Sequence, residues 1–111
     1  MTVNDLINNN LFDTVKVASD TSRTINTVFN CDLLSIAMSK APSDCAWVTV
    51  MGNINTLAVA SLADVSCIIL AEGVALDEAA QAKIESQDIT VFKTQLPVFD
   101  ASLKVYELIN A

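Results

Sequence analysis

Three short, β-branched apolar segments constrain the fold of this chain more than any other feature of the sequence. They are 45–51 (CAWVTVM), 67–71 (CIILA) and 89–93 (ITVFK). Nearly continuous apolar runs of this length are typical of strands that are covered on both faces. Helical segments at 54–64 and 77–87 separate them. Strands that alternate with helices predict an α/β fold: a single three-layer domain with a mainly parallel sheet and βαβ crossovers.

The N-terminal part of the chain predicts three further elements. Thr2 and Asp5 resemble a capping box, which indicates a short first helix. Segment 11–18 alternates between apolar and polar residues like a half-buried strand, and 25–31 is a second, weaker strand candidate.

Two more helices follow from caps and apolar spacing. We expect Asp32 to cap a helix that ends just before Pro42, and Pro97 to open an amphipathic C-terminal helix. The helix at 54–64 carries apolar residues all around its circumference, among them Leu57 and Leu62. We therefore expect it to be wholly buried in the core.

The composition narrows the class of protein. A chain of 111 residues, 52% of them apolar, predicts one domain spanning 1–111. Its net charge of −7 disfavours nucleic acid and membrane surfaces as partners. No basic leader or long apolar run is present, and the three cysteines have wide spacings in apolar contexts. These features predict a cytoplasmic protein with buried, reduced thiols.

The residues that most enzymes use are missing from the sequence. With two glycines and no histidine, the chain has neither a phosphate-binding glycine loop nor the commonest general base. Asp77 and Glu78 form a pair of carboxylates, but they lie where helix starts ordinarily carry acidic residues. We therefore expect no enzymatic activity, no metal site and no cofactor.

Polar residues follow each of the three central strands. Asn53 and Asn55 come after the first, Glu72 after the second and Thr94 after the third. Open α/β sheets bind ligands outside the carboxyl ends of their strands. Asn53 is also a good N-cap for the following helix. The sequence leaves open whether these loops are turns only or also bind a ligand.

Several stretches of the chain resemble the DRTGG domain, which occurs in bacterial regulatory proteins. The most specific are DLLS (32–35), WVT (47–49), NTLAVA (55–60) and EGV (72–74), and the similarity covers nearly the whole chain. DRTGG domains occur at the front of HPr kinase/phosphorylase-like and phosphotransacetylase proteins, between paired CBS modules in some pyrophosphatases, and as small free-standing proteins. The resemblance implies an α/β fold, a regulatory or assembly role and often dimerisation, and it does not imply catalysis.

The naming motif of that family is degenerate here. Segment 22–26 reads SRTIN, which keeps Arg23 and Thr24 but lacks both glycines. We hypothesise that a shallow pocket for a small metabolite or nucleotide is lined by six residues: Arg23, Thr24, Asn53, Asn55, Glu72 and Thr94.

Two functions remain open from the sequence. The first is a non-catalytic regulatory module that forms a homodimer and binds a small molecule at the strand ends. The alternative is a protein–protein interaction subunit without a small-molecule ligand. For the dimer contact, the better candidate surfaces are the C-terminal helix and the region 25–38.

Overall fold

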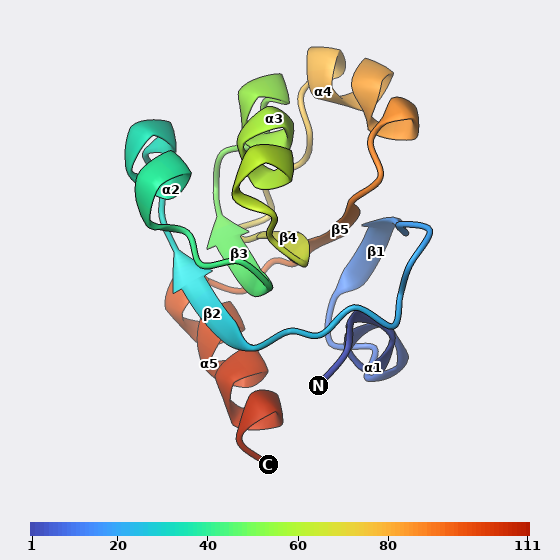
Figure 1. Cartoon of the computed structure of the whole chain (residues 1–111), viewed down its shortest axis with the longest axis vertical. Coiled ribbons are helices and arrows are strands. Elements are labelled where there is room, and N and C mark those ends of the chain that lie inside the picture. The colour runs from blue at the N-terminus through green and yellow to red at the C-terminus, as the bar shows by residue number, and fades with distance from the viewer.

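A five-stranded sheet forms the middle of the computed structural model, which describes all 111 residues (Figure 1). The strand order is β1-β5-β4-β3-β2, so β1 and β2 are the two edges. Strands β2 to β5 are parallel, and β1 runs antiparallel to β5. The strands are β1 (Asp13–Lys16), β2 (Thr27–Asn30), β3 (Cys45–Thr49), β4 (Cys67–Leu70) and β5 (Thr90–Lys93).

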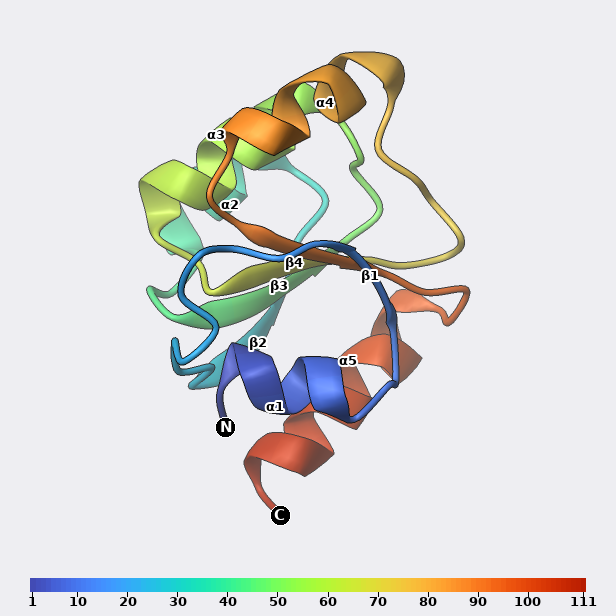
Figure 2. The same ribbon diagram turned by 90° about the vertical axis from the view of Figure 1, so that its right-hand side faces the viewer.

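Helices cover both faces of this sheet. Helices α2, α3 and α4 lie on one face, and α1 and α5 lie on the other (Figures 1 and 2). The predicted three-layer α/β architecture with a mainly parallel sheet is confirmed. No helix combines the length and the apolar character needed to cross a membrane. The helices are α1 (Val3–Asn8), α2 (Leu34–Lys40), α3 (Ile54–Ala63), α4 (Glu78–Lys83), the 3₁₀ turn η1 (Ile84–Ser86) and α5 (Val98–Ile109).

The central strands are apolar at almost every position because both of their faces are buried. Trp47 and Ile68 pack into the core beneath α2, α3 and α4. Val48, Ile69 and Phe92 pack into the core on the α1 and α5 side. Every residue of β3 and β4 is buried. The pattern that predicted doubly covered strands is therefore confirmed.

The two edge strands are short. The strand predicted at 11–18 is confined to the four residues of β1, and its pairing with β5 shifts register between Thr14 and Lys16. The strand predicted at 25–31 is confined to β2, which pairs with β3 on one side only. Each edge strand therefore contributes few ladder hydrogen bonds.

Most of the predicted helix caps are present. Thr2 and Asp5 form the capping box of α1, with the Thr2 amide donating to Asp5 Oδ2 at 2.9 Å. Asn53 caps α3 as predicted. Asp77, which was expected only as an acidic residue at a helix start, caps α4 through a bond from the Ala80 amide at 2.9 Å. The helix predicted at 77–87 is α4 followed by the 3₁₀ turn η1.

Two expectations about helices were wrong. Leu33, not Asp32, occupies the N-cap of α2, and it makes no side-chain cap bond. Asp32 instead accepts from the hydroxyl of Thr49 at 2.8 Å and from the amide of Val50 at 2.9 Å, because it faces the end of β3. Helix α3 is also not buried all round: Leu62 is 71% exposed, because only one side of α3 faces the sheet.

Candidate functional site

Asn53 and Asn55 lie at the carboxyl edge of the sheet, at the start of α3. The side chain of Asn53 accepts from the Thr56 amide at 3.0 Å, so the predicted cap is confirmed. Asn55 is exposed in the first turn of the helix. Of these two asparagines, only Asn55 has a side chain that makes no hydrogen bond within the chain.

Glu72 and Thr94 lie at the same edge, in loops that are joined by backbone hydrogen bonds. The Gly73 amide donates to the Thr94 carbonyl at 2.9 Å, and the Glu72 amide donates to the Leu96 carbonyl at 2.9 Å. Glu72 is exposed and has a φ of 60°, a left-handed conformation unusual for a residue with a side chain. The backbone of these two loops is thus already paired.

Gly52, in the loop after β3, packs closely against the loop that joins β4 to α4. The Asp77 amide donates to the Gly52 carbonyl at 2.7 Å. A Cβ atom added to Gly52 would lie only 2.3 Å from the Ala75 carbonyl oxygen. Glycine is needed here because another backbone segment, rather than a ligand, approaches it.

Arg23 and Thr24 lie at the opposite, amino edge of the sheet. Arg23 pairs with Asp44, which precedes β3, and with Asp64, which follows α3. The carbonyl of Thr24 accepts a hydrogen bond from Ser66, which precedes β4. The structure therefore brings four of the six hypothesised residues to one edge and two to the other, and they do not line one pocket.

The reason lies in the direction of β1. Because β1 runs antiparallel to β5, the chain that leaves it at Val17 emerges at the amino edge. Residues 17–26 cross that edge before entering β2 from its amino end. The hypothesis treated the loop with Arg23 as if it lay among the carboxyl ends.

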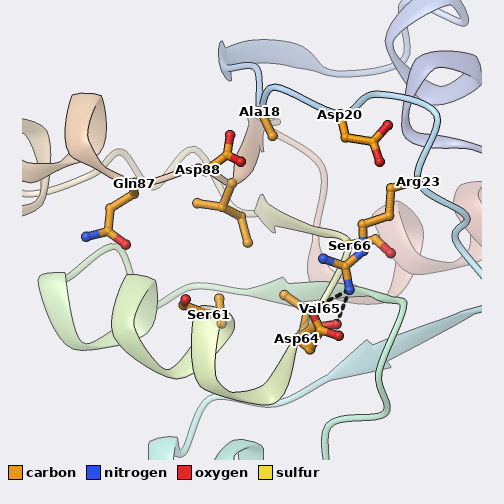
Figure 3. Close-up of a pocket in the computed structure, with 11 residues that line it drawn as sticks. Ala18, Asp20, Arg23, Ser61, Asp64, Val65, Ser66, Gln87 and Asp88 are labelled. Atoms are coloured by element: carbon orange, nitrogen blue, oxygen red, sulfur yellow. Dashed lines mark hydrogen bonds and ion pairs between the residues drawn. The ribbon is translucent and has the colours of Figure 1, made fainter.

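A small polar cavity of about 200 Å³ lies beside Arg23 at the amino edge. Figure 3 shows Arg23 on one side of it and Gln87 on the other. The cavity contains three carboxylates and one guanidinium, so it would repel an anionic ligand. Its lining residues are Ala18, Asp20, Arg23, Ala60, Ser61, Asp64, Val65, Ser66, Gln87, Asp88 and Ile89.

The charged groups around this cavity already have partners within the chain. Arg23 lies 3.0 Å from a carboxylate oxygen of Asp44 and 2.9 Å from one of Asp64. Asp88 accepts from both the amide and the hydroxyl of Ser19 at 2.7 Å, and these bonds lower the pKa of its carboxyl. These contacts join segments of the amino edge to one another. Sequence reasoning missed Asp64 and Asp88 because it examined only the carboxyl ends of the strands.

The cysteines are all free, and two of them are deeply buried. Burial raises the pKa of the Cys45 thiol to about 11 and raises that of Cys67 as well, so neither is a thiolate at neutral pH. Cys31 is half-buried, which corrects the expectation that all three thiols are inside. No group of three or more Cys, Asp and Glu side chains has an arrangement suited to a metal ion.

Helix α2 lies above the edge strand β2 and α5 lies below it in Figure 1, and both helices carry exposed apolar side chains. Each of these side chains is between 42% and 68% exposed. We call them, together with the open edge of β2, the β2-edge surface. They are Leu33 and Ile36 at the start of α2 and Phe99, Leu103 and Tyr106 on α5. Both regions expected to carry an apolar contact thus contribute to this surface.

The chain was also compared with known proteins. No protein-family model and no curated protein matches it, so the resemblance to DRTGG domains stays a prediction.

Proposed function

We propose that this protein is a non-catalytic regulatory or assembly module that acts by binding protein through its β2-edge surface. The observation that carries the proposal is that α2 and α5, which flank the unpaired edge of β2, both carry exposed apolar side chains. Contiguous apolar surface of this kind marks interaction sites in monomeric folds. The resemblance to DRTGG domains supports the same regulatory or assembly role.

The alternative of a metabolite or nucleotide site has weaker support. The loops at the carboxyl edge are bonded to one another, and Gly52 packs against the Ala75 carbonyl. At the amino edge, Arg23 is already paired with two carboxylates. Lys93, at the carboxyl end of β5, is exposed and makes no ion pair, so it is a cation that a phosphate at that edge could contact.

A thermal-shift screen separates the two functions. Mononucleotides, dinucleotides and acyl phosphates are added one at a time, up to millimolar concentration. A ligand present at about a hundred times its Kd would add roughly 2.7 kcal/mol and raise the Tm of a domain this size by about 10 °C or more. We expect no compound to change the Tm.

Two variants identify the edge responsible if a compound does shift the Tm. Asn55→Ala removes an exposed side chain at the carboxyl edge, and Ser61→Ala removes a hydroxyl from the cavity wall at the amino edge. A dose-dependent shift that one variant abolishes and the other keeps would contradict the proposed function and assign a ligand site to that edge.

A further inference from the structure

We propose that the cavity beside Arg23 binds a small organic cation, a primary ammonium group on a short aliphatic chain. We call it the amino-edge cavity. Three parts of the chain enclose it: residues 18–23, the end of α3 with residues 65–66, and residues 87–89. The inference goes beyond the proposed function, because none of these parts belongs to the β2-edge surface.

The size of the amino-edge cavity limits the ligand to a small molecule. Its volume is about 200 Å³, below the roughly 300–1,000 Å³ of pockets that hold drug-sized ligands. A mononucleotide exceeds this space, whereas a short alkyl amine does not. The ligand class must therefore be explained by a few groups on the cavity wall.

The charge around the cavity favours a cation. Asp20, Asp64 and Asp88 line it, and Arg23 is the one basic residue in the lining. Arg23 is also paired with Asp44, so these four carboxylates and one guanidinium have a net charge of −3. The guanidinium thus neutralises only part of the negative charge.

The carboxylates have acceptor capacity left for a ligand. Asp88 accepts two hydrogen bonds from Ser19, and Asp20 accepts two from Ser22. A carboxylate has about four lone-pair sites, and an ammonium group has three donors. Figure 3 shows Asp20 and Asp88 on one side of the cavity and Asp64 on the other. An ammonium between them can donate to both sides.

The C-terminal end of α3 is an independent source of negative potential at the cavity. It contributes Ala60, Ser61 and Asp64 to the wall, and the last turn of the helix contains no basic residue. The carbonyl groups at a helix C-terminus carry a partial negative charge that attracts cations. The helix and the carboxylates therefore favour the same class of ligand.

Apolar side chains line the rest of the cavity. Ala60, Val65 and Ile89 are each less than a tenth exposed, and Ala18 lies among them in the lining. An aliphatic chain buries apolar surface there while its ammonium group reaches the carboxylates, as the stems of lysine side chains do at protein surfaces. A metal ion has no such chain, and the carboxylates are not arranged to coordinate one.

An NMR titration of isotope-labelled protein with butylamine at neutral pH tests this inference. We expect saturable shifts of the amide signals of residues 18–23, 60–66 and 87–89. Butanol has the same chain without the charge, and sodium chloride matches the ionic strength; neither should give a saturable change there. No saturation with butylamine, or an equal response to butanol, would overturn the inference and leave the proposed function in place.

Charge substitutions on the α3 wall test the location of the site. Ser61→Lys places a tethered ammonium beside the carboxylates and should weaken butylamine binding by about tenfold or more. Ser61→Glu adds a side chain of similar length and opposite charge and should bind at least as tightly as wild type. Leu62→Lys makes the same change in charge as Ser61→Lys at a residue outside the cavity, and its affinity should stay within about threefold of wild type.

Two results with these variants would overturn the inference. Equal weakening by Ser61→Lys and Ser61→Glu would mean that the added bulk, and not the charge, is responsible. Equal weakening by Ser61→Lys and Leu62→Lys would mean that the amine responds only to the overall charge of the chain. Circular dichroism and thermal unfolding establish that each variant is folded.

The same chemistry occurs in a free amine and in the lysine side chain of another protein. Nα-acetyl-lysine amide carries its ammonium on a similar stem but adds a peptide group at the other end. An affinity equal to that of butylamine would support a lysine side chain as the natural ligand, and a loss of about tenfold or more would support a free amine. Failure of both compounds to bind would overturn the cation site itself.

Discussion

Two neighbouring asparagines at the start of α3 have different structural roles. Asn53 accepts the Thr56 amide, which would otherwise be an unpaired donor at the helix start. We expect Asn53→Ala to lower the free energy of unfolding by about 1 kcal/mol. Asn55→Ala should change it by less than about 0.5 kcal/mol, because that side chain is exposed. Urea denaturation of both variants measures the difference, and equal losses would show that the cap bond does not stabilise α3.

Arg23 holds together two residues with unusual backbone conformations. Asp44 and Asp64 both have positive φ angles, 64° and 60°, where glycine would be less strained. Their carboxylates both bind the guanidinium of Arg23, which a glycine could not do. Segment 22–26, which contains Arg23, therefore has a structural role at the amino edge.

At the level of elements, Asp32 connects the start of α2 to the end of β3. Its Oδ1 atom accepts from the hydroxyl of buried Thr49 and from the amide of Val50. Removing it leaves a buried polar group short of a partner, which costs about 1–3 kcal/mol. We expect Asp32→Ala to lose stability in that range.

Asp32→Asn is the matched control because it keeps an acceptor oxygen in the same place. It should lose clearly less stability than Asp32→Ala in the same urea titration. If the two variants lose equal amounts, the charge of Asp32 and not its hydrogen bonds would be responsible.

Elements whose signal is local could be predicted from the sequence, and those whose signal is tertiary could not. The continuous apolar runs of β3, β4 and β5 and the caps Thr2 and Asn53 are visible in a few adjacent residues. The role of Asp32 depends on β3, which begins 13 residues later. Asp32 was therefore assigned to the N-cap of α2, although its side chain binds the end of β3.

The candidate site shows the same limit at longer range. The residues after β3, β4 and β5 were placed correctly at one edge, because parallel strands share a direction. Arg23 was misplaced because its position depends on the antiparallel pairing of β1 with β5, whose strands are more than 70 residues apart in the chain. A four-residue strand gives no sequence signal of its direction.

For the whole molecule, three exposed carboxylates contribute to the response to acid. Asp5, Asp20 and Asp88 accept hydrogen bonds from Thr2, Ser22 and Ser19, and these bonds lower the pKa of each below the ordinary 3.8. The ionised form is thus favoured in the folded state. Its contribution to stability is fully present above about pH 4 and is lost as the pH falls through the lower folded-state pKa values.

We therefore expect the Tm to be nearly constant from pH 7 to pH 5 and to fall below about pH 4. Asp88→Asn should have a lower Tm than wild type at pH 7, because Ser19 loses a charged acceptor. The difference should shrink as the pH falls through the lowered pKa of Asp88, because the wild-type carboxyl then becomes neutral as well. A Tm difference that stays constant across this range would rule out a contribution from the ionised carboxylate.

The irregular, charged strand β1 protects one edge of the sheet against uncontrolled association. A sheet with two receptive edges can add copies without limit and form a fibre. Strand β1 has a register shift and carries the charges of Asp13 and Lys16, which leave no regular row of groups for another strand. A chain with one protected edge cannot extend its sheet in both directions, so association through the sheet would end after one pairing and would not lengthen into filaments.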